Sequence, residues 1–182
     1  MEMSHALPGP AAAEAGDLSS VDDLVVLLFR EEGASLVRLA RFFVDDRTAA
    51  EDVVQEAFIR LARSAHRIRE RDRAAAYLRS IVLNLARDHN RRGLVSLRHR
   101  PSADPTPASV EEEVAARAEQ RRVIEALRDL PRRQRDCVVL RYYLELPVAG
   151  IADTLGLSAN SVKTHLQRGL RALETRLEVT AE

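Results

Sequence analysis

Residues 34–92 contain neither glycine nor proline, and this absence limits the possible fold more than any other feature of the chain. Apolar residues recur in this stretch at intervals of three and four, which is the repeat of one face of an α-helix. The three apolar stripes lie within 36–43, 53–61 and 77–85. Thr48 and Glu51 form a candidate capping box for the middle helix. The alternation typical of β-strands occurs nowhere in the chain, so we predict an all-α protein.

The chain is expected to form two small helical domains joined by a flexible linker. Pro101, Pro105 and Pro107 lie among serine, threonine and alanine, a composition typical of extended linkers. Ser109 and Glu112 then form a second candidate capping box. The predicted order is a disordered acidic tail, a first domain, the linker and a second domain, over residues 1–20, 21–93, 94–110 and 111–178.

The net charge of zero hides two basic blocks. The net charge is −5 over residues 1–24, +6 over 25–100, −4 over 101–120 and +3 over 121–182. Two basic blocks separated by an acidic strip favour two modules that face an anion, and nucleic acid is the commonest large anion.

Several classes of protein are disfavoured by what the chain lacks. The longest apolar run, 24–29, is far short of the roughly 20 residues that span a bilayer, so we expect no membrane partner. A single cysteine, Cys137, cannot form an internal disulfide, which fits a cytoplasmic protein. The histidines show no zinc-type spacing with this cysteine, and no arrangement for general acid–base catalysis occurs. We therefore predict no metal, no cofactor and no enzymatic activity.

Residues 148–173 have the pattern of a helix-turn-helix. Gly156 suits a turn that needs a positive φ, and Ser158 is a good N-cap for the second helix. The apolar face of that helix consists of Val162, Leu166, Leu170 and Leu173. Its polar face consists of Asn160, Ser161, Lys163, Thr164, Gln167, Arg168 and Arg171. Such a face can read base edges and hold phosphates. The alternative is an αα-hairpin whose polar face is only solvated.

Two segments resemble regions of bacterial sigma factors. AAEDVVQEAFIRLAR (49–63), followed by AAYLRSIVLNLARDHNRR (75–92), resembles region 2. LRDLPRRQRDCVVLRYYLELPVAGIADTLGLSANSVKTHLQRGLRAL (127–173) resembles region 4. The order of the segments and the length of the chain are those of the extracytoplasmic-function (ECF) group of the sigma-70 family. The resemblance implies sigma region 2 over 21–93 and a winged-helix-like sigma region 4 over 111–178.

The function implied by this resemblance is that of an alternative sigma factor. Such a protein binds core RNA polymerase, recognises the −35 and −10 promoter elements and helps to melt the −10 region. In the family, an Asp-x-x-Gln-Glu motif docks on the coiled coil of the polymerase β′ subunit, and the matching residues are Asp52, Gln55 and Glu56. From the residues alone, an acidic face exposed to solvent is the simpler interpretation. The polymerase β flap, promoter DNA and an anti-sigma factor are the other implied partners, although nothing in the sequence identifies an anti-sigma factor.

The resemblance also implies two sets of DNA-binding residues. The positions for the −10 element are His66, Arg67, Arg69, Tyr77, Asn84, Arg87, Arg91 and Arg92. The positions for the −35 element are Arg132, Arg133, Asn160, Ser161, Lys163, Thr164, Gln167, Arg168 and Arg171. Tyr77 stands where many relatives have tryptophan, and we favour a core role over base stacking for it. Asn84 could instead be a satisfied internal amide.

Two other functions stay open at this point. A stand-alone helix-turn-helix transcriptional regulator would bind duplex DNA without polymerase, but it has no need of the helical block that ends at 84–92. An adaptor would use only the face of Asp52, Gln55 and Glu56. We also expect the acidic tail and linker to compete with DNA for the basic blocks in the free protein.

Overall fold

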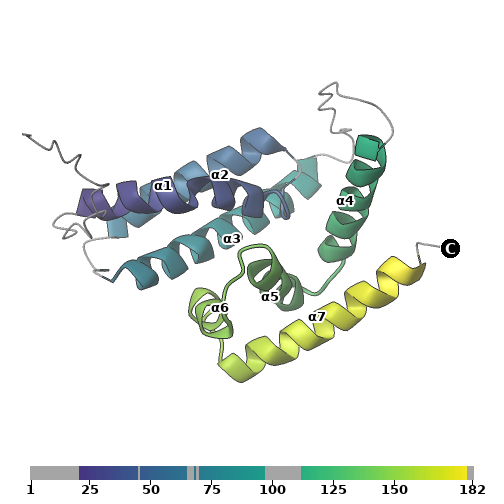
Figure 1. Cartoon of the computed structure of the whole chain (residues 1–182). Helices are drawn as coiled ribbons and strands as arrows, with labels where there is room; N and C mark the ends of the chain where they lie inside the picture. Colours follow the sequence, from purple (N-terminus) through teal and green to yellow (C-terminus); the bar gives the residue numbers. More distant parts are fainter. Residues whose placement is uncertain (1–20, 45, 65–67, 69, 97–111, 180–182) are drawn as a thin grey trace, which may run out of the picture.

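A computed structural model describes residues 21–44, 46–64, 68, 70–96 and 112–179. Within these residues the fold is all-α, as predicted, and seven helices follow one another without a strand (Figure 1). The first three helices are α1 (Val21–Ala40), α2 (Arg47–Ser64) and α3 (Arg71–Ser96). The others are α4 (Glu112–Arg128), α5 (Arg132–Tyr142), α6 (Val148–Leu155) and α7 (Ala159–Val179). The described residues of the second domain therefore contain the helices of a winged-helix domain but no β-strand that could form a wing.

Helices α1, α2 and α3 pack against one another as a three-helix bundle. Its core is aliphatic, with Phe43 at one end, and fully buried side chains include Leu28, Leu36, Leu61 and Leu78. Each helix places one apolar stripe inward, which is the arrangement that the 3.6-residue repeat predicts.

The start of α2 differs from the predicted capping box. The helix begins at Arg47, and the Asp46 carboxylate accepts a hydrogen bond from the Thr48 amide at 3.2 Å. Glu51 pairs with the Arg47 side chain at 2.8 Å. Aspartate is as good an N-cap as threonine, and in the structure Asp46, which precedes the helix, is the residue that caps it. The second predicted box, at Ser109, lies outside the described residues.

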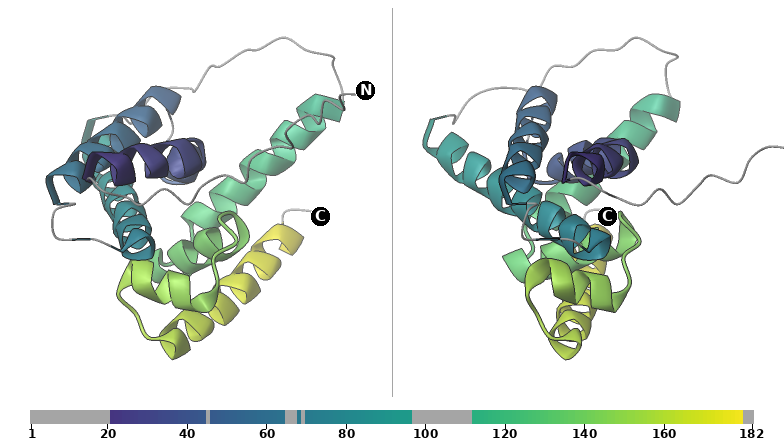
Figure 2. Two further views of the ribbon diagram at one scale, coloured as in Figure 1. Left: turned by 60° about the vertical axis from the view of Figure 1, so that its left-hand side comes forward. Right: turned by 90° about the vertical axis from the view of Figure 1, so that its left-hand side faces the viewer.

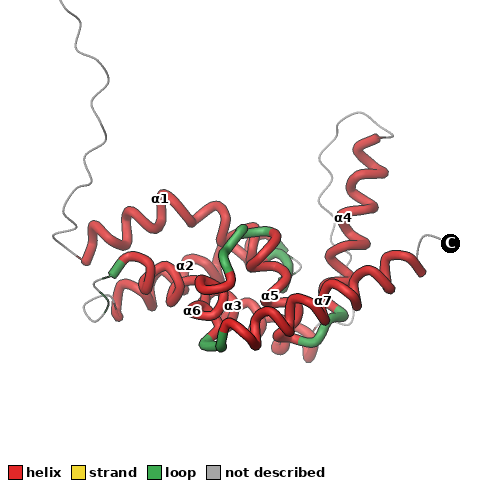
Figure 3. The backbone as a smooth tube through the Cα atoms, turned by 60° about the horizontal axis from the view of Figure 1, so that its bottom comes forward, coloured by secondary structure: helices red, strands yellow, loops and turns green. Residues whose placement is uncertain are grey.

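Helices α4 to α7 form the second bundle, in which α7 contacts α4, α5 and α6. The predicted helix-turn-helix is confirmed as α6 and α7. Gly156 ends α6 in the left-handed region with φ of 62°, and Ser158 Oγ accepts a hydrogen bond from the Ser161 amide at 3.1 Å. Figure 3 shows α6 and α7 joined by this short turn, with the start of α4 standing away from the rest.

The inward face of α7 differs from the prediction at one position. Val162 is fully buried, but Leu170 is 39% exposed, and Gly169 is buried in its place. A Cβ atom on Gly169 would lie 2.8 Å from Val138 Cγ2 of α5, so the missing side chain lets the two helices approach closely. A straight helix drifts from a strict spacing of four, which is why position 169 and not 170 turns inward.

The two bundles lie against each other. Figure 1 shows α5 and α6 lying along α3, and α3 contacts α6 directly. The buried residues of both bundles form one continuous apolar cluster. The sequence predicts two domains joined by a flexible linker over 94–110. Residues 94–96 of that range belong to α3, and the rest of the predicted linker and the predicted tail lie outside the described residues. None of the helices in the described ranges is both long and apolar enough to cross a membrane.

Candidate nucleic-acid and protein interfaces

The polar face of α7 is open to solvent at the end that follows the turn. Its residues are exposed except for Ser161, which is half-buried; the exposed ones are Asn160, Lys163, Thr164, Gln167, Arg168 and Arg171. Thr164 Oγ1 donates to the Asn160 carbonyl at 3.0 Å, and the amide and cationic residues of this face are exposed. Amides and cations on one exposed helix face suit base edges and phosphates respectively.

Arg132 and Arg133 begin α5, beside this face. Arg133 Nη1 donates to the Leu155 carbonyl at 3.4 Å, so it caps the end of α6. Arg132 Nη2 donates to Asn84 Oδ1 on α3 at 3.3 Å. Both residues remain exposed to solvent. Of the two −35 positions on α5, Arg133 therefore lies near the end of α6, and Arg132 reaches across to the first bundle.

The residues predicted for the −10 element are only partly brought together. Asn84 is exposed, and its Oδ1 accepts hydrogen bonds from Arg87 at 3.0 Å as well as from Arg132. Arg87 is not free: its Nη2 lies 2.6 Å from Asp136 Oδ2 of α5. Tyr77 is 39% exposed, so the favoured core role is wrong and its ring is accessible for stacking.

The remaining −10 positions belong to the loop before α3 and to the last turns of that helix. His66, Arg67 and Arg69 lie outside the described residues. Arg91 and Arg92 belong to the last turns of α3, where the structure describes the backbone only. Arg91 lies on the face that carries Asn84 and Arg87, because residues four and seven positions apart share one face of a helix, and Arg92 lies to one side of it.

Buried charges surround the ring of Phe43 at the junction of the bundles. The guanidinium carbon of Arg135 lies 4.8 Å from the ring centroid, and that of Arg87 lies 5.7 Å from it. Burial lowers the pKa of both arginines, and the Asp136 carboxylate opposes this shift. One carboxylate and one aromatic ring thus compensate two buried cations.

The Cys137 thiol lies next to Asp136 and is fully buried. Burial, with the negative charge of Asp136 as a smaller contribution, raises its pKa from 9.0 to about 11. The unfolded chain ionises this thiol first as the pH rises, so the stabilising contribution is complete below pH 9 and is lost towards pH 11. The free energy of unfolding is expected to fall by about 2–3 kcal/mol over this interval. Urea titrations of the native chain and of Cys137→Ala between pH 9 and pH 11 would measure this fall. The prediction is contradicted if the free energy of unfolding falls equally with pH in the two proteins.

The polar residues of α2 form a second exposed surface. Asp52 and Gln55 are exposed, and Glu56 is half-buried with its carboxylate 2.7 Å from Arg60 Nε. The structure therefore places the three predicted residues together on the outer side of α2. This face is electrically mixed, because the Arg60 cation partly neutralises Glu56, and Asp52 is its most accessible carboxylate.

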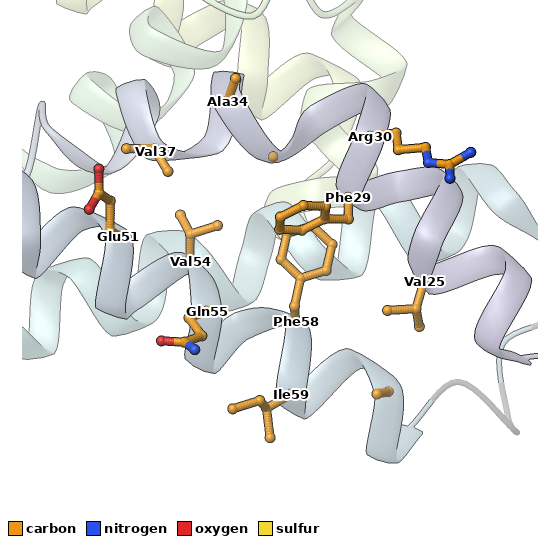
Figure 4. A pocket seen from close by; sticks show the side chains of 12 residues that line it. Val25, Phe29, Arg30, Ala34, Val37, Glu51, Val54, Gln55, Phe58 and Ile59 are labelled. Carbon is orange, nitrogen blue, oxygen red and sulfur yellow. The ribbon is translucent and has the colours of Figure 1, made fainter.

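An apolar groove of about 850 Å³ runs between α1 and α2 beside this face (Figure 4). Phe29 and Phe58 meet edge to face in it, with ring centroids 5.3 Å apart. Phe29 is 61% exposed and Ile59 is 42% exposed, and Gln55 lines the same groove. Large apolar side chains that lie together on a surface mark contact sites for other proteins.

Asp136 and the groove were missed by the sequence analysis. A signal for Asp136 was present, since this acid stands beside the apolar residues 137–140 in a strongly basic segment. The groove had a weaker signal in Phe29, a large ring within a helix that otherwise buries aliphatic residues. Within the described residues, no group of histidine, cysteine, aspartate and glutamate side chains could hold a metal ion.

Comparisons with known proteins match both halves of the chain. The family model described as Sigma-70 region 2 matches residues 28–93, and the one described as Sigma-70, region 4 matches residues 120–173. The RNA polymerase sigma-E factor of Streptomyces avermitilis is 32% identical over 144 residues, which cover 79% of each chain. The ECF RNA polymerase sigma factor SigL of Mycobacterium tuberculosis is 32% identical over 177 residues, covering 93% of this chain and 94% of SigL.

Two solved structures have a similar backbone. CnrH, in its complex with the cytosolic domain of CnrY, superposes with a TM-score of 0.67 at 27% identity, covering 88% of this chain and 91% of CnrH. The sigma factor RpoE of Bartonella quintana, in complex with the anti-sigma factor NepR, superposes with a TM-score of 0.63 at 19% identity. That second match covers 87% of this chain and 98% of RpoE.

Proposed function

The chain belongs to the ECF group of the sigma-70 family, and on that basis we propose that it directs core RNA polymerase to promoters by binding their −35 and −10 elements. The observation that carries the proposal is the presence of two different exposed surfaces on one chain. One is the cationic and amide-bearing face of α7, and the other is the mixed polar face of α2 with its apolar groove. The first suits DNA, and the second suits a protein.

For the −35 element we propose that α7 lies in the major groove. Its first turns carry Asn160, Lys163 and Gln167 towards the base edges, and Arg168 and Arg171 reach phosphates. The N-terminus of a helix also attracts phosphate through its unpaired amides. Arg133, which caps α6, adds a phosphate contact on the flank.

For the −10 element we propose that α3 and the loop before it hold the melted strand. Tyr77 presents an exposed ring on which a base can stack, and stacking compensates the cost of unstacking from the duplex. Asn84 and Arg87 follow on the same helix, where they can contact a base edge and a phosphate, with Arg91 and Arg92 further along it. The loop residues His66, Arg67 and Arg69 belong to the same proposed surface.

For core polymerase we propose that Asp52, Gln55 and Glu56 dock on the β′ coiled coil, with the groove taking apolar side chains of the same partner. The groove shares Gln55 with this face, so one partner can cover both. The second bundle would contact the β flap. The chain itself would perform no catalysis and would act in the cytoplasm, lending promoter specificity to the polymerase.

An anti-sigma factor is part of the proposal. CnrH was solved with the cytosolic domain of CnrY bound, and RpoE was solved with a protein named as an anti-sigma factor. A stand-alone regulator accounts only for α4–α7, whereas a family model also matches residues 28–93. No observation favours that alternative.

Transcription with purified components tests the proposal. Core polymerase would be incubated with genomic fragments with and without the chain, and the 5′ ends of the transcripts would be sequenced. We expect starts that depend on the chain and share two upstream elements. Transcript patterns that are identical with and without the chain would refute the proposal.

Two substitutions on α7 separate the proposed phosphate contacts from base contacts. Arg168→Ala is expected to weaken binding to all promoter duplexes alike and to lower the slope of log affinity against log salt by about 0.9. Gln167→Ala is expected to leave that slope unchanged and to lose about 1–3 kcal/mol of discrimination at one base pair. Fluorescence anisotropy over a salt series measures both, with Arg121→Ala of α4 as the control for an exposed arginine elsewhere. The assignment is wrong if the two variants have the same salt slope.

A further inference from the structure

A buried ion pair joins the two bundles. Arg87 comes from α3, Asp136 comes from α5, and the atoms Nη2 and Oδ2 are 2.6 Å apart. The Arg87 side chain is 11% exposed, and that of Asp136 is fully buried. A buried pair that loses one partner leaves an uncompensated charge in a poorly hydrated site, so this contact resists opening unless another ion replaces the missing one.

Other contacts surround the pair and also cross between the bundles. Arg38 Nε donates to the Tyr143 hydroxyl at 2.7 Å, and the rings of Phe42 and Tyr143 meet edge to face with centroids 4.9 Å apart. Arg128 Nη2 lies 3.5 Å from the Val44 carbonyl, at the limit of a hydrogen bond. Both views of Figure 2 show the ribbons of the first bundle close to those of α5 and α6.

The closed arrangement occupies the proposed −10 surface. Asn84 is engaged by Arg132, and Arg87 is engaged by Asp136. A guanidinium binds carboxylate and phosphate oxygens through the same planar set of N–H donors. The Arg87 side chain is only 11% exposed in this arrangement, so the second bundle covers its guanidinium and a DNA phosphate can reach it only when the bundles separate.

We propose that Asp136 is an internal competitor for DNA: in the free chain its carboxylate occupies Arg87, and a phosphate of the −10 strand takes its place when the bundles separate. This inference rests on the proposed function, because it needs α3 to bind the −10 strand. The exchange does not leave a buried charge alone, since Arg87 gains a phosphate and the Asp136 carboxylate gains water when the bundles separate.

The position of the other surfaces sets an order of events. The exposed face of α2 lies outside the contacts between the bundles, so Asp52 and Gln55 are accessible in the closed chain. Core polymerase can therefore bind first and the −10 strand second. Fifteen residues, 97–111, separate the two bundles in the sequence, and a fully extended chain of that length reaches about 50 Å.

The experiment measures closure and DNA binding in the same full-length chain. In a Cys137→Ala background, Arg63→Cys on α2 and Glu174→Cys on α7 provide exposed positions for a donor and an acceptor dye. The DNA probe is a fluorescent single strand that carries the non-template −10 element of a promoter mapped in the transcription assay. The variant is Asp136→Asn, which keeps the shape of the side chain and removes its charge.

Asp136→Asn is expected to lower the energy transfer between the dyes and to tighten binding of the single strand about tenfold or more, because the closed state no longer hides Arg87. Asp153→Asn, an exposed aspartate on α6, is the matched control and is expected to change neither quantity. Binding of a −35 duplex verifies that the second bundle of the variant is folded.

Unchanged energy transfer in a folded Asp136→Asn chain would overturn the proposal, and so would separation of the dyes without tighter binding of the single strand. If Asp136→Asn does not fold, the same two measurements are made on Tyr143→Phe. This variant removes only the hydrogen bond from Arg38 across the junction of the bundles and keeps the ring. A smaller change of both quantities in the same direction supports the proposal, and no change overturns it. Promoter-specific transcription by the wild-type chain establishes the proposed function whatever the dyes report.

Discussion

Asp52→Lys combined with Glu56→Lys is expected to abolish promoter-directed transcription while leaving the fold intact. Asp52 is exposed, so its replacement costs within about 0.5 kcal/mol. Glu56 is half-buried and paired with Arg60, so its replacement costs about 1 kcal/mol. At the interface with a basic coiled coil, however, the reversal turns two attractive contacts into repulsive ones, which cost several kcal/mol together. The affinity for core polymerase is expected to fall by a factor of about 100 or more, as measured by competition binding.

The matched control for this reversal is Glu70→Lys combined with Asp72→Lys. These exposed acids lie just before and within the first turn of α3, so the net charge changes equally while the α2 face is untouched. The control is expected to retain its affinity for polymerase. If both double variants bind polymerase equally well, α2 is not the docking face.

Phe43→Ala is expected to be the most destabilising single truncation at the junction of the bundles. The ring is 1% exposed and is covered by the guanidinium groups of Arg87 and Arg135, so truncation leaves a cavity beside two buried cations. Truncation of a buried phenylalanine costs about 3–5 kcal/mol. The midpoint of thermal unfolding is expected to fall by about 10 °C, at 2–4 °C per kcal/mol for a chain of this size.

Phe43→Leu separates the volume of the side chain from its aromatic character. Leucine fills most of the cavity but offers no π face to the two guanidinium groups, each of which is worth about 0.5–2 kcal/mol over a ring. We expect a loss of about 1–3 kcal/mol in urea titrations, clearly below that of Phe43→Ala. A leucine variant as unstable as the alanine variant would show that packing alone does not set the cost, whereas an alanine variant that loses less than about 1 kcal/mol would remove Phe43 from the core.

Local patterns predicted the helices well because the relevant forces act within a few residues. The left-handed Gly156, the Ser158 cap and the apolar stripes of the first bundle all follow from spacing and side-chain chemistry. The errors are equally local. Asp46 caps α2 where Thr48 was expected, and Gly169 turns inward where Leu170 was expected, since a near-tie between neighbouring positions is decided by packing.

The relation between the bundles could not be predicted in this way. Arg87 and Asp136 lie far apart in the sequence, and each has an ordinary local setting: an arginine on a polar stripe and an acid among arginines. Their pairing depends on how two preformed surfaces fit, which periodicity does not encode. The DNA-binding and polymerase-binding residues came from the resemblance to sigma factors, and composition alone pointed only to an anionic partner.

The exposed ammonium of Lys163 has a practical consequence. It is the chain's single lysine, and it lies on the open face of α7. Reagents or enzymes that acylate lysine therefore have one side-chain target, in the middle of the proposed recognition surface. Its rate of acylation records, without mutation or an attached dye, what fraction of the molecules has this helix covered by a duplex.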